Sequence, residues 1–187
     1  MRTGAAGLTT FAVIVWSNFA TAGPVLDAAL QAEALQEQGK TVEALDALEA
    51  AMDKICETSP LVFGRVAIVE TSEGFGNFVE RIDTTFKPDE KLLVYVEPKC
   101  LGFGEMQSVG FTADLSIANM TGQALGEAKD VFSISTSGPR DISATLSFTV
   151  PYLRPGDYKA TFTVHDENSD RSGTFEVPFK IGLPTAN

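Results

Sequence analysis

The chain has 187 residues, of which 44% are hydrophobic and 21% are charged, a composition that excludes a mainly disordered protein. Acidic residues outnumber basic ones by 25 to 14, for a net charge of −11. We therefore expect no nucleic-acid partner, since such a partner requires a basic face. The single His and the two Cys exclude His-rich metal centres and Cys clusters.

Residues 1–22 are predicted to be a cleaved secretory signal peptide. Arg2 gives a basic start, Leu8 to Phe19 is largely apolar, and Ala20 to Ala22 has the small-x-small pattern of a cleavage site. The alternative is an uncleaved anchor, but the apolar run is shorter than the ~20 residues of a membrane span. We expect a periplasmic or extracellular mature chain that has no membrane span.

Residues 23–60 are expected to form an α-helical hairpin. The segment is rich in Ala, Leu, Glu and Gln, and Pro24 suits a first helical turn. Gly39 and Lys40 interrupt the pattern, and Thr41 can cap a second helix. Apolar residues recur at three- and four-residue spacing, which predicts one stripe on each helix. The stripes are Leu26, Leu30 and Ala34 on the first helix, and Leu45, Leu48, Met52 and Ile55 on the second.

The hairpin resembles a single tetratricopeptide repeat. The resemblance lies in Gly39, Ala44 and Ala51, followed by Pro60, and the aromatic positions of that repeat are missing. It implies a helical surface that binds a protein partner. One repeat cannot bury its own apolar face. The alternative is therefore a hairpin that packs on the next domain or on a second copy of itself.

Residues 61–183 change to a period of two, which indicates β-strands with one buried face. Seven or eight short strands without intervening helices predict an antiparallel sandwich. Pro178 suggests an edge strand, because Pro cannot donate to a strand ladder. The clearest strands are 111–118, 144–150, 158–165 and 175–181, and weaker ones are 63–70, 78–82, 92–97 and 131–135.

Residues 153–158 have the sequence L-R-P-G-D-Y at the start of an alternating strand. This turn resembles the one before the penultimate strand of many bacterial immunoglobulin-like modules. The resemblance implies a tyrosine corner, in which the Tyr158 hydroxyl hydrogen-bonds to upstream backbone. The expected fold is mainly β: an antiparallel immunoglobulin-like β-sandwich of seven or eight strands with an N-terminal α-helical hairpin.

Cys56 and Cys100 are predicted to form a disulfide bond, because their number is even and the expected compartment is oxidising. The bond would close a long loop and stabilise the fold by about 4 kcal/mol. The alternative is two free thiols, one at the end of a helix and one in a loop.

Asp166, Asn168 and Asp170 have a D-x-N-x-D spacing that can present oxygen ligands to Ca²⁺. Arg171 and Val177, however, stand where a calcium-binding helix-loop-helix motif requires Gly and Glu. The pattern therefore favours the alternative, a polar turn between two strands.

Two loops share a Gly-Phe-Gly pattern, centred on Phe75 and Phe103. If both lie at one end of the sandwich, the two rings can form a binding patch for a small ligand or a glycan. The alternative, which the usual burial of large aromatics favours, is that each ring fills an end of the core.

No catalytic motif is recognised, and His165 has no evident nucleophile or orienting acid. We expect a non-enzymatic protein without a cofactor, acting as an interaction or scaffold module of the cell envelope. The partner would be a protein, or a second copy bound through the hairpin. The alternatives are a small-ligand or glycan binder at the Gly-Phe-Gly loops and, less favoured, a hydrolase using surface carboxylates or His165.

Overall fold

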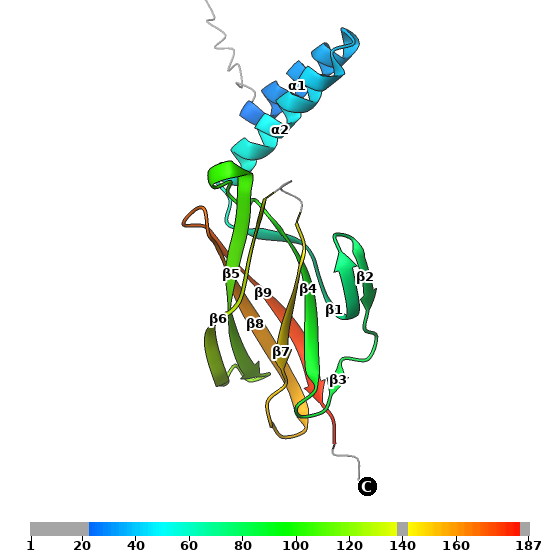
Figure 1. Cartoon of the computed structure of the whole chain (residues 1–187), viewed down its shortest axis with the longest axis vertical. Coiled ribbons are helices and arrows are strands. Elements are labelled where there is room, and N and C mark those ends of the chain that lie inside the picture. The colour runs from blue at the N-terminus through cyan, green and yellow to red at the C-terminus, as the bar shows by residue number, and fades with distance from the viewer. Residues whose placement is uncertain (1–22, 138–141, 184–187) are drawn as a thin grey trace, which may run out of the picture. The chain divides into compact units, whose positions relative to one another are not determined.

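The computed structural model describes residues 23–137 and 142–183, so the predicted signal peptide lies outside the described residues (Figure 1). The chain divides into two compact units between Ala51 and Met52, and each is described separately below. Within the described ranges, no helix combines the length and the apolar character that crossing a membrane requires.

The predicted helical hairpin is confirmed, with helix α1 at Pro24–Glu37 and helix α2 at Thr41–Glu57. The N–H groups of Gly39 and Lys40 donate to the carbonyls of Gln36 and Leu35, which closes α1 with a Schellman turn. Gly39 has φ +75°, a left-handed conformation that Gly adopts without strain. Thr41 is the first helical residue, so Lys40 takes the cap position predicted for Thr41.

The buried residues of the two helices are alanines, namely Ala32, Ala44 and Ala51. Small side chains let two helix axes approach closely. The predicted Leu-rich stripes lie on the outside instead, and the residues of the α2 stripe are 43–56% exposed. The hairpin therefore leaves most of its large apolar side chains in contact with solvent.

One sheet has four antiparallel strands in the order β2-β1-β4-β7 (Figure 1). Its strands are β1 (Val62–Gly74), β2 (Asn77–Glu80), β4 (Lys91–Lys99) and β7 (Ala144–Thr149).

The other sheet has five strands in the order β3-β9-β8-β5-β6. Its strands are β3 (Thr85–Phe86), β5 (Ser108–Asn119), β6 (Ala124–Ser137), β8 (Gly156–Asp166) and β9 (Ser172–Ile181). A short 3₁₀ helix, η1 (Glu105–Gln107), precedes β5.

All eight expected strands are present, and β3 is an additional one. It pairs in parallel with β9, so the expectation of a wholly antiparallel fold is wrong at this pair. Two residues are too few for an alternating pattern, so β3 could not be predicted from hydrophobic periodicity. Because β3 pairs only with Lys180 and Ile181, it leaves the outer side of Pro178 without a strand partner, as the sequence suggested.

Arg81 holds the chain around β3 in place. Its guanidinium donates to the carbonyl oxygens of Asp83 and Thr85 and to a Glu90 carboxylate oxygen at 2.7 Å, and it lies 4.0 Å from the centre of the Phe86 ring. Burial raises the pKa of Glu90, but the Lys87 N–H and the Arg81 guanidinium outweigh it and lower the pKa below its ordinary value.

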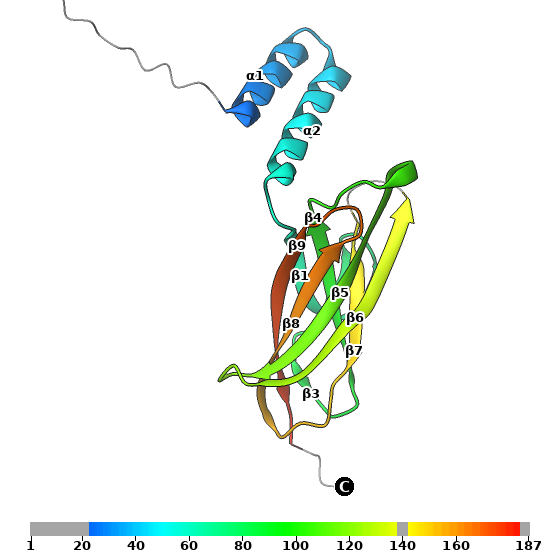
Figure 2. The same ribbon diagram turned by 90° about the vertical axis from the view of Figure 1, so that its left-hand side faces the viewer.

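The two sheets lie face to face and share one buried core, so the mainly β expectation is confirmed (Figure 2). Inward side chains alternate most clearly along β8 and β9, as the period of two predicted. The first sheet contributes Ile68, Leu92, Val94, Val96 and Leu146, and the second contributes Phe111, Ala113, Phe162, Val164 and Phe179.

The hydrogen bond expected of Tyr158 is present at the start of β8. Its hydroxyl donates to the carbonyl oxygen of Arg154 at 2.6 Å, while its ring is buried and packs near Phe179. The bond fixes the turn that leads the chain into β8.

Candidate functional site

The predicted disulfide between Cys56 and Cys100 is confirmed. The two Cα atoms are 4.9 Å apart, within the ordinary range for a disulfide. The bond joins the last turn of α2 to the residue that follows β4, across a sequence separation of 44.

Asp166 is the one buried charged side chain among the described residues. Its Oδ2 accepts hydrogen bonds from the N–H of Gly102 at 2.8 Å and from the Ser169 hydroxyl, and lies 3.5 Å from Arg171 Nη2. Its Oδ1 accepts from the N–H of Asn168 at 3.1 Å. The carboxylate therefore organises two loops that are more than sixty residues apart in the chain.

Arg171 extends this network to the end of helix α2. Its Nη1 donates to the carbonyl oxygen of Cys56 at 2.8 Å, and its Nε donates to the Ser169 hydroxyl at 2.9 Å. The last carbonyls of a helix lack intrahelical partners and attract cations. Arg171 therefore supplies a hydrogen-bond donor to a terminal carbonyl of α2, that of the disulfide-bonded Cys56.

Asn168 holds the Gly102–Gly104 loop against β5 and the end of β8. Its side-chain amide donates to the carbonyl oxygens of Gly102 and Ser108. A Cβ on Gly104 would lie 2.3 Å from the Asn168 side-chain oxygen. A side chain at this position would therefore displace the Asn168 amide that holds the loop, a constraint that the Gly-Phe-Gly pattern did not indicate.

The three residues of the D-x-N-x-D pattern are used differently from one another. Asp166 and Asn168 bind backbone groups, whereas Asp170 is exposed and takes no part in their hydrogen bonds. In the part of the chain that the structure describes, no group of three or more His, Cys, Asp or Glu side chains could hold a metal ion. These contacts are those of a polar turn, which the sequence favoured over a calcium site.

Phe75 lies outside the core, at the tip of the β1–β2 loop, and its side chain is 49% exposed. The flanking Gly74 and Gly76 both have positive φ. The loop is anchored by a hydrogen bond from the Gly76 N–H to the Tyr95 hydroxyl. The Lys99 ammonium lies 5.1 Å from the centre of the Phe75 ring, which places Phe75 beside the end of β4.

Phe103 lies in the loop that leaves the same end of β4, and it is 38% exposed. The sequence favoured rings that fill the ends of the core, but neither Phe75 nor Phe103 belongs to the buried cluster. The structure brings both aromatic loops to the same end of β4.

His165 has a partner that the sequence did not identify. Its Nε2 lies 3.2 Å from Asp114 Oδ2 across the β5–β8 pair. The pKa of Asp114 is lowered, chiefly by a hydrogen bond from the Asp130 N–H. Burial opposes this effect, and smaller contributions from His165 add to the lowering. Within the described residues, the side-chain hydrogen bond of His165 is the one to Asp114, and no hydroxyl or thiol hydrogen-bonds to its ring.

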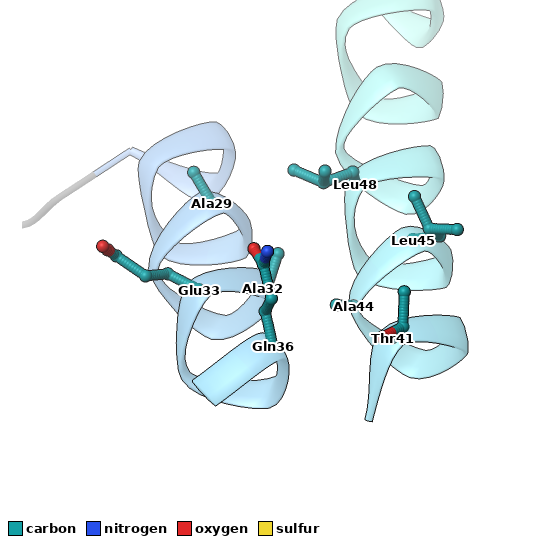
Figure 3. Close-up of a pocket in the computed structure, with 8 residues that line it drawn as sticks. All are labelled: Ala29, Ala32, Glu33, Gln36, Thr41, Ala44, Leu45 and Leu48. Carbon is teal, nitrogen blue, oxygen red and sulfur yellow. The ribbon is translucent and has the colours of Figure 1, made fainter. Parts of the chain in front are cut away.

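Helices α1 and α2 form a groove of about 400 Å³ between them (Figure 3). Leu45 and Leu48 project from α2, and Glu33 and Gln36 project from α1. The sequence suggested a helical binding surface, but not a groove in which alanines bring the helices together. The lining consists of Ala29, Ala32, Glu33, Gln36, Thr41, Ala44, Leu45 and Leu48.

No protein-family model matches the chain, and no curated protein matches it either. Among solved structures, a family 123 glycoside hydrolase from Clostridium perfringens is similar over 66% of this chain and 27% of its own, with 12% identity and a TM-score of 0.42. The alkylpurine DNA glycosylase AlkC from Pseudomonas fluorescens is similar over 79% of this chain and 40% of its own, with 10% identity and a TM-score of 0.36.

The sporulation control protein Spo0M from Bacillus subtilis is similar over 67% of this chain and 50% of its own, with 10% identity and a TM-score of 0.36. The chain thus spans between about a quarter and a half of the length of these proteins. Similarities at this level assign neither a family nor an activity.

Proposed function

We propose that the protein is an exported, non-enzymatic interaction module of the cell envelope, in which the helical hairpin binds a protein. The observation that carries the proposal is the exposure of large apolar side chains on both helices. Large exposed apolar side chains that gather on one element are typical of interaction sites. Eight such side chains are 42–68% exposed: Val25, Leu26, Leu30, Val42, Leu45, Leu48, Met52 and Ile55.

Export is supported by the disulfide bond, since such bonds persist in oxidising compartments, and by the signal-like pattern of residues 1–22. An immunoglobulin-like sandwich is supported by the shared core of the two sheets and by the Tyr158 hydrogen bond. Under this proposal the sandwich is the stable carrier and the hairpin is the binding element.

In-cell photo-crosslinking tests the binding role of the hairpin. A photoreactive residue is placed at Leu48, which is 43% exposed on α2, or at Tyr152, an 84% exposed control outside the helices. We expect a discrete cross-linked species from Leu48 and none from Tyr152. Equal labelling at both positions, or none at Leu48, would refute the binding role. An intact mass that still includes residues 1–22 would refute signal cleavage.

A second candidate is a small-ligand or glycan site at the two aromatic loops. It is supported by the partial exposure of Phe75 and Phe103. The second loop is also fixed, because Gly102 donates its N–H to Asp166 and accepts a hydrogen bond from the Asn168 amide at its carbonyl oxygen. A glycan array tests it with the wild type and with Phe75→Ala. A specific signal that Phe75→Ala abolishes supports this function, and the absence of any signal refutes it.

A further inference from the structure

We propose that the groove between α1 and α2 binds a basic amphipathic helix of a partner protein, an inference that rests on the proposed role of the hairpin. The groove runs along positions one helical turn apart on both helices, from Ala29 to Gln36 on α1 and from Thr41 to Leu48 on α2 (Figure 3). Each stretch spans about two turns, or ~10 Å, which matches the contact length of a short helix.

The shape of the groove favours a helix over an extended segment. Ala32 and Ala44 are buried at 6% and 7% exposure, so small side chains form the part of the lining where the two helices meet. Leu45 and Leu48 remain 56% and 43% exposed beside them. A helix satisfies its own backbone hydrogen bonds, whereas an extended segment would bring unsatisfied backbone groups against this apolar lining.

The charge of the hairpin selects a basic occupant. Between Gly23 and Glu57 the chain has eight acidic and two basic residues, which gives a net charge of −6. Lys54 forms an ion pair with Glu57 at 2.7 Å. In the described structure Glu33, which lines the groove, has no ion-pair partner. Lys or Arg residues beside the apolar ridge of a partner helix would complement this charge.

The same charge disfavours a second copy of the hairpin as the occupant. Pairing two hairpins would bring −6 against −6, and like charges facing one another across an interface oppose association. The attraction to a basic helix, in contrast, would weaken with salt, because exposed charges are screened beyond ~8 Å at physiological ionic strength.

Fluorescence anisotropy of the purified exported protein tests this proposal with three labelled helical peptides. All three carry the same Leu and Ala ridge, and their flanking positions are Lys, Gln or Glu. We expect the Lys peptide to bind at least about tenfold more tightly than the Gln peptide, and the Glu peptide not to bind. Raising the salt concentration should remove most of the advantage of the Lys peptide.

Two matched pairs of variants locate the site. Leu45 on α2 and Val79 on β2 are 56% and 54% exposed, but only Leu45 lines the groove, so Leu45→Ala should weaken binding about tenfold and Val79→Ala should leave it unchanged. On α1, Glu33→Gln should weaken the Lys peptide about threefold, and Glu37→Gln, outside the groove, should not. Circular dichroism verifies that each variant is folded.

Equal binding of the Lys and Glu peptides, equal effects within either matched pair, or no peptide binding would overturn the proposal. A concentration-dependent dimer that Leu45→Ala dissociates would also overturn it, with a second copy as the occupant. That last result leaves the proposed binding role of the hairpin intact, because the role is decided separately by the Leu48 cross-link.

Discussion

Replacing Asp166 with Asn is expected to destabilise the sheet unit, although the two side chains have nearly the same shape. Asp166 Oδ2 faces the N–H of Gly102 and the Ser169 hydroxyl, and its Oδ1 faces the N–H of Asn168. An Asn amide turned either way places an NH₂ group against at least one of these donors. One buried donor then loses its acceptor, and the contact with Arg171 loses its charge.

The magnitude follows from these two losses. A buried donor without an acceptor costs about 1–3 kcal/mol. The Asp166–Arg171 pair is long, at 3.5 Å, and the Arg171 side chain is 24% exposed, so its loss adds about 1 kcal/mol at most. We expect Asp166→Asn to lower the free energy of unfolding by about 1–4 kcal/mol, a large share of the typical stability of a domain.

Urea unfolding followed by far-UV circular dichroism measures this loss, since the single Trp lies at position 16. Asp170→Asn is the matched control, because Asp170 is exposed in the same loop, and it should change stability by less than about 0.5 kcal/mol. A loss below that value for Asp166→Asn would refute the role of the network. If calcium stabilises the wild type and both variants abolish that effect, the loop is a metal site instead.

Three further outcomes are expected. Replacing Cys56 and Cys100 together with Ser should cost about 4 kcal/mol, measured by urea unfolding against the oxidised wild type. Tyr158→Phe, which removes the hydrogen bond to Arg154, should cost about 1 kcal/mol with little change in the circular dichroism spectrum. Because the pKa of Asp114 is lowered in the folded state, its ionised form stabilises the fold at pH values above the unfolded-state pKa. The difference in unfolding free energy between the wild type and Asp114→Asn should therefore shrink as the pH falls below about 4.

Most of the eight strands were predictable because they have one face in the core. Along β8, buried Ala160, Phe162 and Val164 alternate with outward residues, and this alternation is visible in the sequence. β3 has two residues and is positioned by Arg81, whose hydrogen bonds join segments on either side of it. Such contacts depend on how the chain folds back on itself, and no local spacing encodes them.

The candidate site was only partly predictable for the same reason. The spacing of Asp166 and Asn168 correctly marked a turn rich in oxygen acceptors, but it could not indicate the backbone groups that they bind. Those groups, at Gly102 and Ser108, lie about sixty residues earlier in the chain. The two glycines around Phe103 were the available signal, because a glycine can mark a close approach of backbone as well as a bend.

In the hairpin, the apolar stripes that the periodicity predicted are not the residues through which the two helices pack. Its stripes at Leu45 and Leu48 indicated an apolar face, yet the helices meet through Ala32 and Ala44. Full burial of one Leu side chain contributes about 1.5–3 kcal/mol, and an alanine interface forgoes most of that contribution. Two short helices packed in this way are marginally stable, so a bound partner that covers the stripes would stabilise the hairpin by mass action. Partner binding and hairpin order should therefore be coupled.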